Sequence, residues 1–244
     1  MNKQIINRTL IYIAGLLILA LGIILNTKAG LGVSPVISVA YSISQINDFN
    51  FGNTILGLYT LFVTIEIVIH TVKNISSRRN SDNVLAPANK NSLKFIILTD
   101  VLQIPLSIVF TRFMNLFADN IPDFSPKGTN TLPHFCLQLL VLLAALILTG
   151  IGAVMSLNMR IVPNPGDGIV QAISDCIHKS VGFTKNCFDL FNVSLTVCIG
   201  LISTGHLIGI GIGTVLSMIG VGRVIAVFNH FTRDKLVKAA GVEI

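Results

Sequence analysis

Long apolar runs separated by short polar stretches dominate the chain. They lie at residues 10–25, 54–69, 95–117, 137–157, 187–203 and 207–228. Each run is close to the roughly 20 residues that a helix needs to cross about 30 Å of hydrocarbon. The pattern therefore predicts an all-α protein, a polytopic transmembrane helical bundle with about six spans.

Composition supports a membrane protein and excludes a soluble or secreted domain. Hydrophobic residues make up 52% of the chain and charged residues only 11%, whereas about a quarter of a soluble domain is charged. The net charge of +6 sits mainly in short loops, so it reports orientation and does not indicate a nucleic-acid partner. The four cysteines form no CxxC pair, so no disulfide framework, metal site or cofactor is predicted, and the expected partner is the lipid bilayer.

Two halves of the chain repeat the same order of features. Residues 26–61 align without gaps on residues 158–193, which matches Asn26 with Asn158 and Ser42 with Ser174. Each half has a span, a stretch broken by Gly and Pro, a shorter apolar stretch and two further spans. We expect a first membrane repeat at 1–118, including a flexible loop at 74–91, an extracytoplasmic linker at 119–133 and a second repeat at 134–244.

The positions of Lys and Arg decide whether the broken stretches cross the membrane. If each stretch enters and returns on the same side, thirteen cations lie inside and only Lys28 and Lys127 lie outside; if each crosses fully, the count is eight against seven. The positive-inside rule favours the first arrangement. It predicts a multi-pass protein of the cytoplasmic (inner) cell membrane with both termini cytoplasmic, and two repeats of three spans each must then be inverted.

Each broken stretch contains a start signal for a short helix. Ser34-Pro35 and Asn164-Pro165 both place a good N-cap residue before a proline at the first helical position. Two re-entrant half-helices from opposite faces would aim their N-terminal amides at the bilayer centre, where they favour anions. Irregular backbone at that depth implies a water-filled cavity. The alternative is a pair of interfacial helices lying flat, which the lengths also suit.

Polar side chains on or just after these half-helices are the candidate substrate-binding residues. In the second half-helix, Asp167, Gln171 and Ser174 recur at i, i+4 and i+7 and so share one face of the helix. Asp167 could instead cap its own helix. Its negative charge also competes with an anion, so the sign of the substrate stays open. The candidates are Ser34, Ser38, Ser42, Asp167, Gln171, Ser174 and Asp189.

Two charged residues lie deep in the predicted spans. Asp100 shares a face of the third span with Gln103, and Arg223 lies in the sixth span. A buried charge needs a partner or a role, so we predict that Asp100 and Arg223 approach one another, either as a static ion pair or as part of transport. Glu66 is expected near the membrane surface and hydrated. The glycine-rich run at 205–214 predicts close helix contact at Gly209 and Gly213 rather than a phosphate loop.

Several short motifs resemble the YczE/YyaS/YitT group of bacterial integral membrane proteins. They are Gly15-Leu16, Leu31-Gly32-Val33-Ser34-Pro35, Pro165-Gly166-Asp167-Gly168, the stretch 185–189, and Gly211-Ile212-Gly213-Thr214 with Gly220. The resemblance covers most of the chain, but we expect an expanded 74–91 loop and, unlike in the longer members, no soluble C-terminal domain after Ile244. It implies a multi-span bacterial membrane protein and supplies no substrate.

The leading hypothesis is a secondary transporter of a small polar or anionic solute, with proton coupling as one option, working by alternating access around the half-helices. A passive channel shares the same architecture. A membrane-embedded regulatory or accessory subunit without transport of its own is the third hypothesis, and an oligomer is compatible with all three. An enzyme is not expected, because the sequence contains no HExxH, GxSxG or GxGD motif.

Overall fold

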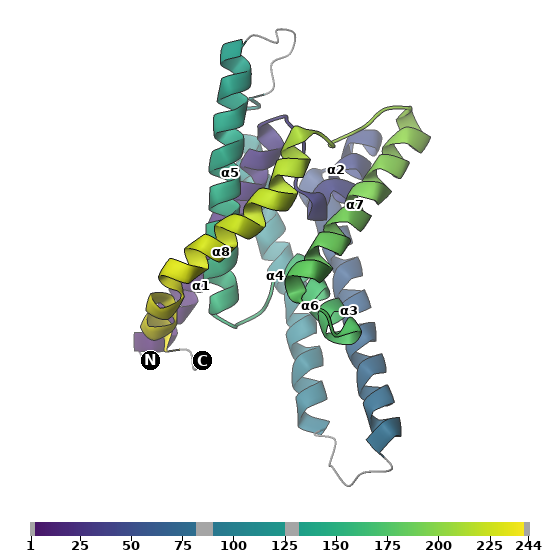
Figure 1. Cartoon of the computed structure of the whole chain (residues 1–244), viewed down its shortest axis with the longest axis vertical. Helices are drawn as coiled ribbons and strands as arrows, with labels where there is room; N and C mark the ends of the chain where they lie inside the picture. The colour runs from purple at the N-terminus through teal and green to yellow at the C-terminus, as the bar shows by residue number, and fades with distance from the viewer. Residues whose placement is uncertain (1–2, 82–89, 125–131, 242–244) are drawn as a thin grey trace.

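The computed structural model describes residues 3–81, 90–124 and 132–241, and this part of the chain is helical and contains no strand (Figure 1). In chain order the helices are α1 (Lys3–Lys28), α2 (Pro35–Asn47), α3 (Phe51–Ser81), α4 (Lys90–Asn120), α5 (Leu132–Asn158), α6 (Pro165–Ile177), α7 (Val181–Thr204) and α8 (Ile212–Ala240). Within the described residues, six helices are long and apolar enough to cross a membrane, and α2 and α6 are not among them. The predicted all-α transmembrane bundle with six spans is confirmed.

The two short helices enter the bundle from opposite ends. In Figure 1, α1 begins and α3 ends toward the lower end, while α4 ends and α5 begins at the upper end. Helix α2 runs from the interior to the upper end, and α6 runs from the interior to the lower end. Pro35 and Pro165 at their starts are buried, whereas Asp48 and His178 at their ends are exposed. The half-helices are therefore re-entrant rather than flat on the membrane surface.

Both half-helices begin and end with similar backbone conformations. Ser34 and Asn164 have extended backbones before the N-terminal prolines, and the Asn164 side chain accepts a hydrogen bond from the Gly166 N–H. Asp48 and His178 then adopt left-handed conformations, at φ 53° and 54°, and end the helices. The N-cap residues of the two half-helices, at 34 and 164, are 130 positions apart in the sequence, and so are their C-cap residues, at 48 and 178. Corresponding helices of the two halves run in opposite directions (Figure 1), so the inverted 3+3 repeat is confirmed.

The two repeats interlock at the centre of the bundle. Helices α1 and α5 cross through small residues: a Cβ on Gly22 would lie 2.5 Å from Thr149 Oγ1, and one on Gly152 would meet the backbone of Leu19. Glycines allow two membrane helices to approach this closely. Each half-helix then packs on the opposite repeat, α2 against α7 and α6 against α3. Neither repeat therefore forms a separate domain.

The polar connections differ in part from the sequence expectation. Helix α3 continues to Ser81, so the loop predicted from 74 was wrong over 74–81; residues 82–89 lie outside the described residues, and α4 has already begun at Lys90. At the predicted linker, Lys28 Nζ lies 3.0 Å from Asp123 Oδ1, and the Phe124 N–H donates to the Lys28 carbonyl. This contact ties the described part of the linker to the end of α1. Residues 125–131 are outside the described residues.

The glycine-rich run serves a different contact from the predicted one. Gly209 lies before α8 and not within it. The Val33 N–H donates to the Gly209 carbonyl at 2.8 Å, and the Gly213 N–H donates to the Leu31 carbonyl at 2.7 Å. A Cβ on Gly211 would collide with the Leu31 carbonyl. The glycines thus admit the irregular backbone that leads into α2, and the expected helix-to-helix contact at Gly209 is wrong.

Candidate functional site

The N-termini of α2 and α6 meet at a cavity near the centre of the bundle. Val36 Cγ1 lies 2.9 Å from the position that a Cβ on Gly166 would occupy. A cavity of about 70 Å³ borders the first residues of both half-helices, Ser34 and Pro35 on one side and Asn164 and Asp167 on the other. The predicted meeting of the two half-helix N-termini is confirmed by this geometry. We call this space the central cavity.

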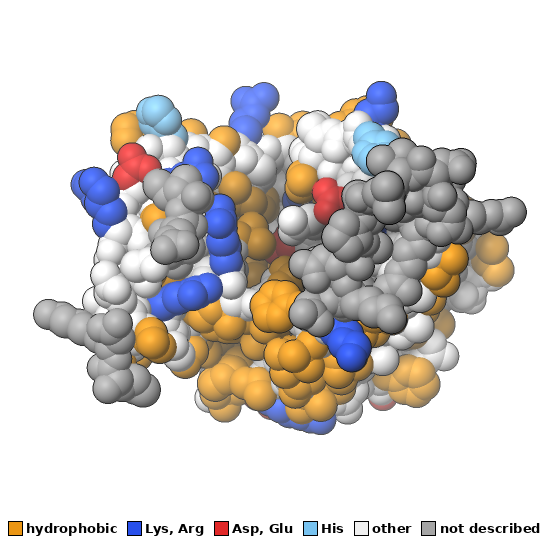
Figure 2. Space-filling model, turned by 90° about the horizontal axis from the view of Figure 1, so that it is seen from below, with side chains coloured by type: hydrophobic (Ala, Val, Ile, Leu, Met, Phe, Trp, Pro, Cys, Tyr) orange, Lys and Arg blue, Asp and Glu red, His pale blue; other side chains and the backbone are white. Residues whose placement is uncertain are grey.

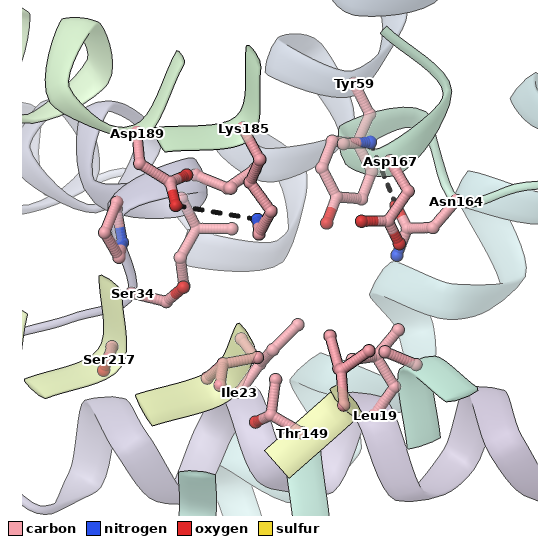
Figure 3. A pocket seen from close by; sticks show the side chains of 17 residues that line it. Leu19, Ile23, Ser34, Tyr59, Thr149, Asn164, Asp167, Lys185, Asp189 and Ser217 are labelled. Carbon is pink, nitrogen blue, oxygen red and sulfur yellow. Dashed lines mark hydrogen bonds and ion pairs between the residues drawn. The ribbon is translucent and has the colours of Figure 1, made fainter. Parts of the chain in front are cut away.

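One wall of the central cavity is polar and the other is mainly apolar (Figure 3). Tyr59 from α3, Asp167 from α6 and Lys185 with Asp189 from α7 lie on the polar side together with Ser34 and Asn164. The facing wall comes from α1, α5 and α8. It is mainly apolar, with Leu19, Ile23, Ala153, Val221 and Ile225, and its two polar residues are Thr149 and Ser217. Both repeats therefore contribute to a single site.

Asp189 is the polar-wall residue with an unsatisfied atom. Its side chain is nearly inaccessible, at 3% exposure, and Lys185 Nζ lies 3.6 Å from its Oδ2. Its Oδ1 is buried and has no hydrogen-bond partner among the described residues. Buried polar atoms are nearly always paired in native proteins, so an unpaired Oδ1 facing this part of the bundle is an unusual feature of the site.

The charges around the central cavity come close to balance. Asp167 and Asp189 carry two carboxylates, and Lys185 carries one ammonium group. Each helix N-terminus adds about half a positive charge. A site with separated charges and no large excess of either sign suits a small dipolar or zwitterionic solute, or an anion that arrives with a proton.

The structure brings three of the predicted site residues to the central cavity, whereas the two predicted serines within α2 lie elsewhere. Ser34, Asp167 and Asp189 line the cavity. The Ser38 hydroxyl is fully buried, donates to the Pro35 carbonyl and lies 2.7 Å from Thr196 Oγ1, so it joins α2 to α7. Ser42 is also fully buried and has no hydrogen-bond partner among the described residues. Neither serine is among the residues that line the central cavity.

The predicted stripe Asp167, Gln171 and Ser174 does not form one binding face. Gln171 is exposed and lines a different pocket, and the Ser174 hydroxyl donates to the Lys179 carbonyl in the turn that ends α6. The helix rises about 1.5 Å per residue away from the centre, so Gln171 lies about 6 Å beyond Asp167. Sharing a helix face was therefore not enough to share the cavity.

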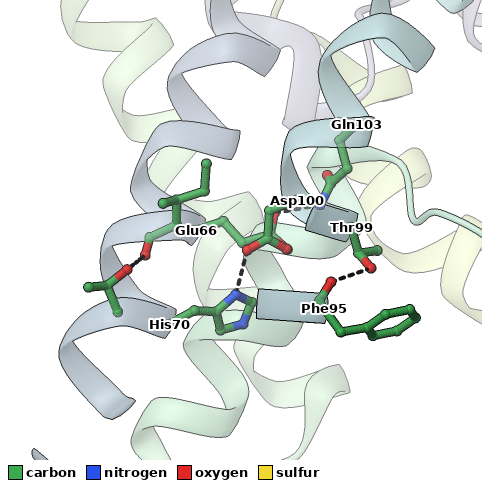
Figure 4. Close-up of polar contacts among 8 residues, drawn as sticks. Glu66, His70, Phe95, Thr99, Asp100 and Gln103 are labelled. Carbon is green, nitrogen blue, oxygen red and sulfur yellow. Dashed lines mark hydrogen bonds and ion pairs between the residues drawn. The ribbon is translucent and has the colours of Figure 1, made fainter. Parts of the chain in front are cut away.

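A second polar cluster lies between α3 and α4 (Figure 4). His70 Nδ1 is 2.8 Å from Asp100 Oδ2, and Gln103 Nε2 donates to Glu66 Oε2 at 3.0 Å. Glu66 and Asp100 are each only 3% exposed, and Gln103 is fully buried. The expectation that Glu66 is hydrated was wrong. We call Glu66, His70, Asp100 and Gln103 the α3–α4 cluster.

The predicted pair of Asp100 with Arg223 is not formed. Asp100 is paired with His70, and Arg223 is exposed on α8. Helix α8 packs along α5 and α1 and makes no extensive contact with α4. Sequence reasoning overlooked His70, although Glu66 and His70 at i, i+4 on one span and Asp100 and Gln103 at i, i+3 on the next were a usable signal.

The fold and the two polar sites define a polytopic helical membrane protein built as an inverted repeat. The chain matches the family described as "Family of unknown function (DUF6198)" over residues 6–82 and 83–230, and it belongs to this family. No curated protein and no solved structure matches it. The resemblance to the YczE/YyaS/YitT group stays a prediction.

Proposed function

We propose that the protein is a secondary transporter that moves a small polar or anionic solute by alternating access around the central cavity. The observation that carries the proposal is the convergence of two half-helix N-termini from opposite repeats on one cavity with three charged side chains. Broken helices that meet within an inverted repeat are a recurrent design of secondary transporters, because the two repeats can rock about a fixed site.

The cavity favours a small solute that presents both donors and acceptors. Its volume of about 70 Å³ is well below the roughly 300–1,000 Å³ of pockets for drug-sized ligands. The half-helix amides and Lys185 would hold a carboxylate or similar group, while Asp189 Oδ1 would accept from a donor. A solute with a net negative charge would upset the balance of the cavity, and proton coupling would restore it.

We place the protein in the bacterial cytoplasmic membrane with both termini in the cytoplasm. Seen from the end that carries the termini, the molecule shows a gathering of Lys and Arg side chains (Figure 2). Lys28, at the opposite end of α1, is paired with Asp123. This asymmetry supports the orientation, since basic residues near spans are retained in the cytoplasm.

Solute counterflow in proteoliposomes tests the transport proposal. A panel of small zwitterions, monocarboxylates and neutral polar solutes is screened first by thermal stabilisation of the purified protein and then by counterflow. We expect saturable counterflow for at least one solute. Asp189→Asn should reduce it at least about tenfold, because losing a charged hydrogen-bond partner costs about 1.5–3 kcal/mol.

The matched control is Asp234→Asn, which removes an exposed carboxylate from α8 and should leave counterflow unchanged. Flux that rises without saturation would favour the passive channel instead. Absence of flux for the whole panel, with folded protein in the vesicles, would reject transport and favour the regulatory or accessory subunit.

A further inference from the structure

We propose that the α3–α4 cluster binds a divalent first-row transition-metal ion such as Zn²⁺ or Mn²⁺. The ligands would be Glu66, His70 and Asp100, with the Gln103 amide oxygen as a fourth. The cluster does not line the central cavity, and the proposal holds whether or not the protein transports a solute.

The Glu66, His70 and Asp100 side chains are close enough to share one ion. One ligand atom from each of Glu66, His70 and Asp100 lies within 4.8 Å of the others. Nitrogen and oxygen ligands about 2.0–2.2 Å from a metal ion are separated by at most about 4.4 Å. Small side-chain rotations would close the difference, and His70 Nδ1 and Asp100 Oδ2 at 2.8 Å are already near the spacing of adjacent ligands.

A buried acceptor without a partner points at the same place. Gln103 is fully buried, and its Oε1 has no hydrogen-bond partner among the described residues. Its amide group is directed toward the carboxylates (Figure 4). A Cβ on Gly168 of α6 would lie 2.8 and 3.0 Å from the Glu66 oxygens and 3.0 Å from Gln103 Oε1. The amide nitrogen and oxygen exchange places by rotation, so Oε1 can face an ion held by Glu66.

Charge also favours a cation at this position. Two carboxylates buried together are costly unless a positive charge compensates them. Lys73, one turn along α3, instead donates to the Asp175 carbonyl at 3.1 Å. A divalent ion would neutralise both carboxylates at once. The imidazole among the ligands favours first-row transition metals over Mg²⁺ and Ca²⁺, which prefer oxygen ligands alone.

The cluster has an access route for an ion. A pocket of about 250 Å³ is bordered by Glu66, His70 and Asp100 together with Thr99, Gln171 and Asp175. Glu66 and Asp100 are themselves almost inaccessible, so the ion would pass from this pocket into a largely dehydrated site. An access route and a complete ligand set are both required of a genuine metal site.

Titration with Co²⁺ tests the proposal on the full chain purified in detergent and stripped of metal by a chelator. We expect one Co²⁺ per chain, seen as visible d–d absorption, displaced by Zn²⁺ and not by Mg²⁺. Glu66→Gln and Asp100→Asn should each weaken binding by at least about tenfold. The control Asp175→Asn alters a carboxylate that borders the same pocket outside the cluster and should change the affinity less than about twofold.

A variant that gains a spectroscopic signal keeps the proposal testable if Glu66→Gln or Asp100→Asn folds poorly. His70→Cys, made in a background in which the four exposed cysteines are replaced by alanine, should add a near-ultraviolet thiolate-to-Co²⁺ charge-transfer band. No Co²⁺ binding to the unaltered chain, binding that Glu66→Gln leaves intact, or no new band in His70→Cys would each overturn the site. No solute is present in these experiments, so their failure would leave the transport proposal standing.

Discussion

Replacing Gly168 with alanine should loosen the packing of α6 against α3 and α4. The added Cβ would lie 2.8 Å from Glu66 Oε2, and ordinary contact begins at 3.4 Å, so about 0.6 Å of movement is needed. The neighbours cannot easily provide it, because Glu66 and Gln103 are buried and bonded to each other. Overpacking of this kind costs about 1–3 kcal/mol.

The same substitution at a second glycine serves as a control that separates this steric cost from the intrinsic stabilisation of a helix by alanine. Alanine stabilises a helix interior by about 0.5–1 kcal/mol relative to glycine. Gly57 of α3 is the matched control, because a Cβ there would meet no atom within 4 Å. Gly57→Ala should therefore show only the gain. Gly168→Ala should be less stable than Gly57→Ala by about 1–3 kcal/mol.

Unfolding in detergent, followed by far-ultraviolet circular dichroism, gives the comparison, since the chain has no tryptophan for fluorescence. Equal free energies of unfolding for Gly168→Ala and Gly57→Ala would refute the close approach of α6 to the α3–α4 cluster. The position of the first half of α6 would then have to be revised.

The remaining predictions use the same unfolding measurement. Ser38→Ala should cost about 1 kcal/mol, because it removes the buried bond between α2 and α7; no loss would mean that this hydroxyl pair is not formed. Lys185→Met should cost about 1–3 kcal/mol by leaving Asp189 uncompensated. Adding Asp189→Asn should recover part of this loss. If the stability losses of the two single variants simply add in the double variant, Lys185 and Asp189 do not form an ion pair. Arg223→Gln should change stability by less than about 0.5 kcal/mol, because Arg223 is exposed. A large loss of stability would mean that Arg223 interacts with a buried partner after all.

The sequence predicted the fold well because its signals are local. Apolar runs long enough to span a bilayer become spans whatever they pack against, and Ser34-Pro35 and Asn164-Pro165 start helices by fixing the backbone at two residues. The end of α3 was missed because polar residues from 74 onward fit a helix that projects beyond the membrane as readily as a loop.

The site was predicted less well because its members come together through tertiary packing. Asp167 and Asp189 were found from their places beside the second half-helix, but Gln171 faces another pocket because α6 leaves the centre within one turn. The partner of Asp100 depends on the rotation and register of α3 against α4, and no spacing within α4 reports that. His70 was hidden for the same reason.

Disulfide cross-linking of Val36→Cys with Gly166→Cys, in the cysteine-free background and in native membranes, tests most directly whether the two half-helices meet. In a disulfide each Cβ lies about 3 Å from the other residue's sulfur, and Val36 Cγ1 is 2.9 Å from a Cβ at 166. The control pairs Val36→Cys with Ile177→Cys, at the exposed far end of α6, about 16 Å farther along the helix. Mild oxidation followed by mass spectrometry should yield the 36–166 linked peptide and no 36–177 peptide. No 36–166 link, or equal yields from both pairs, would contradict the central cavity on which the proposed transport depends.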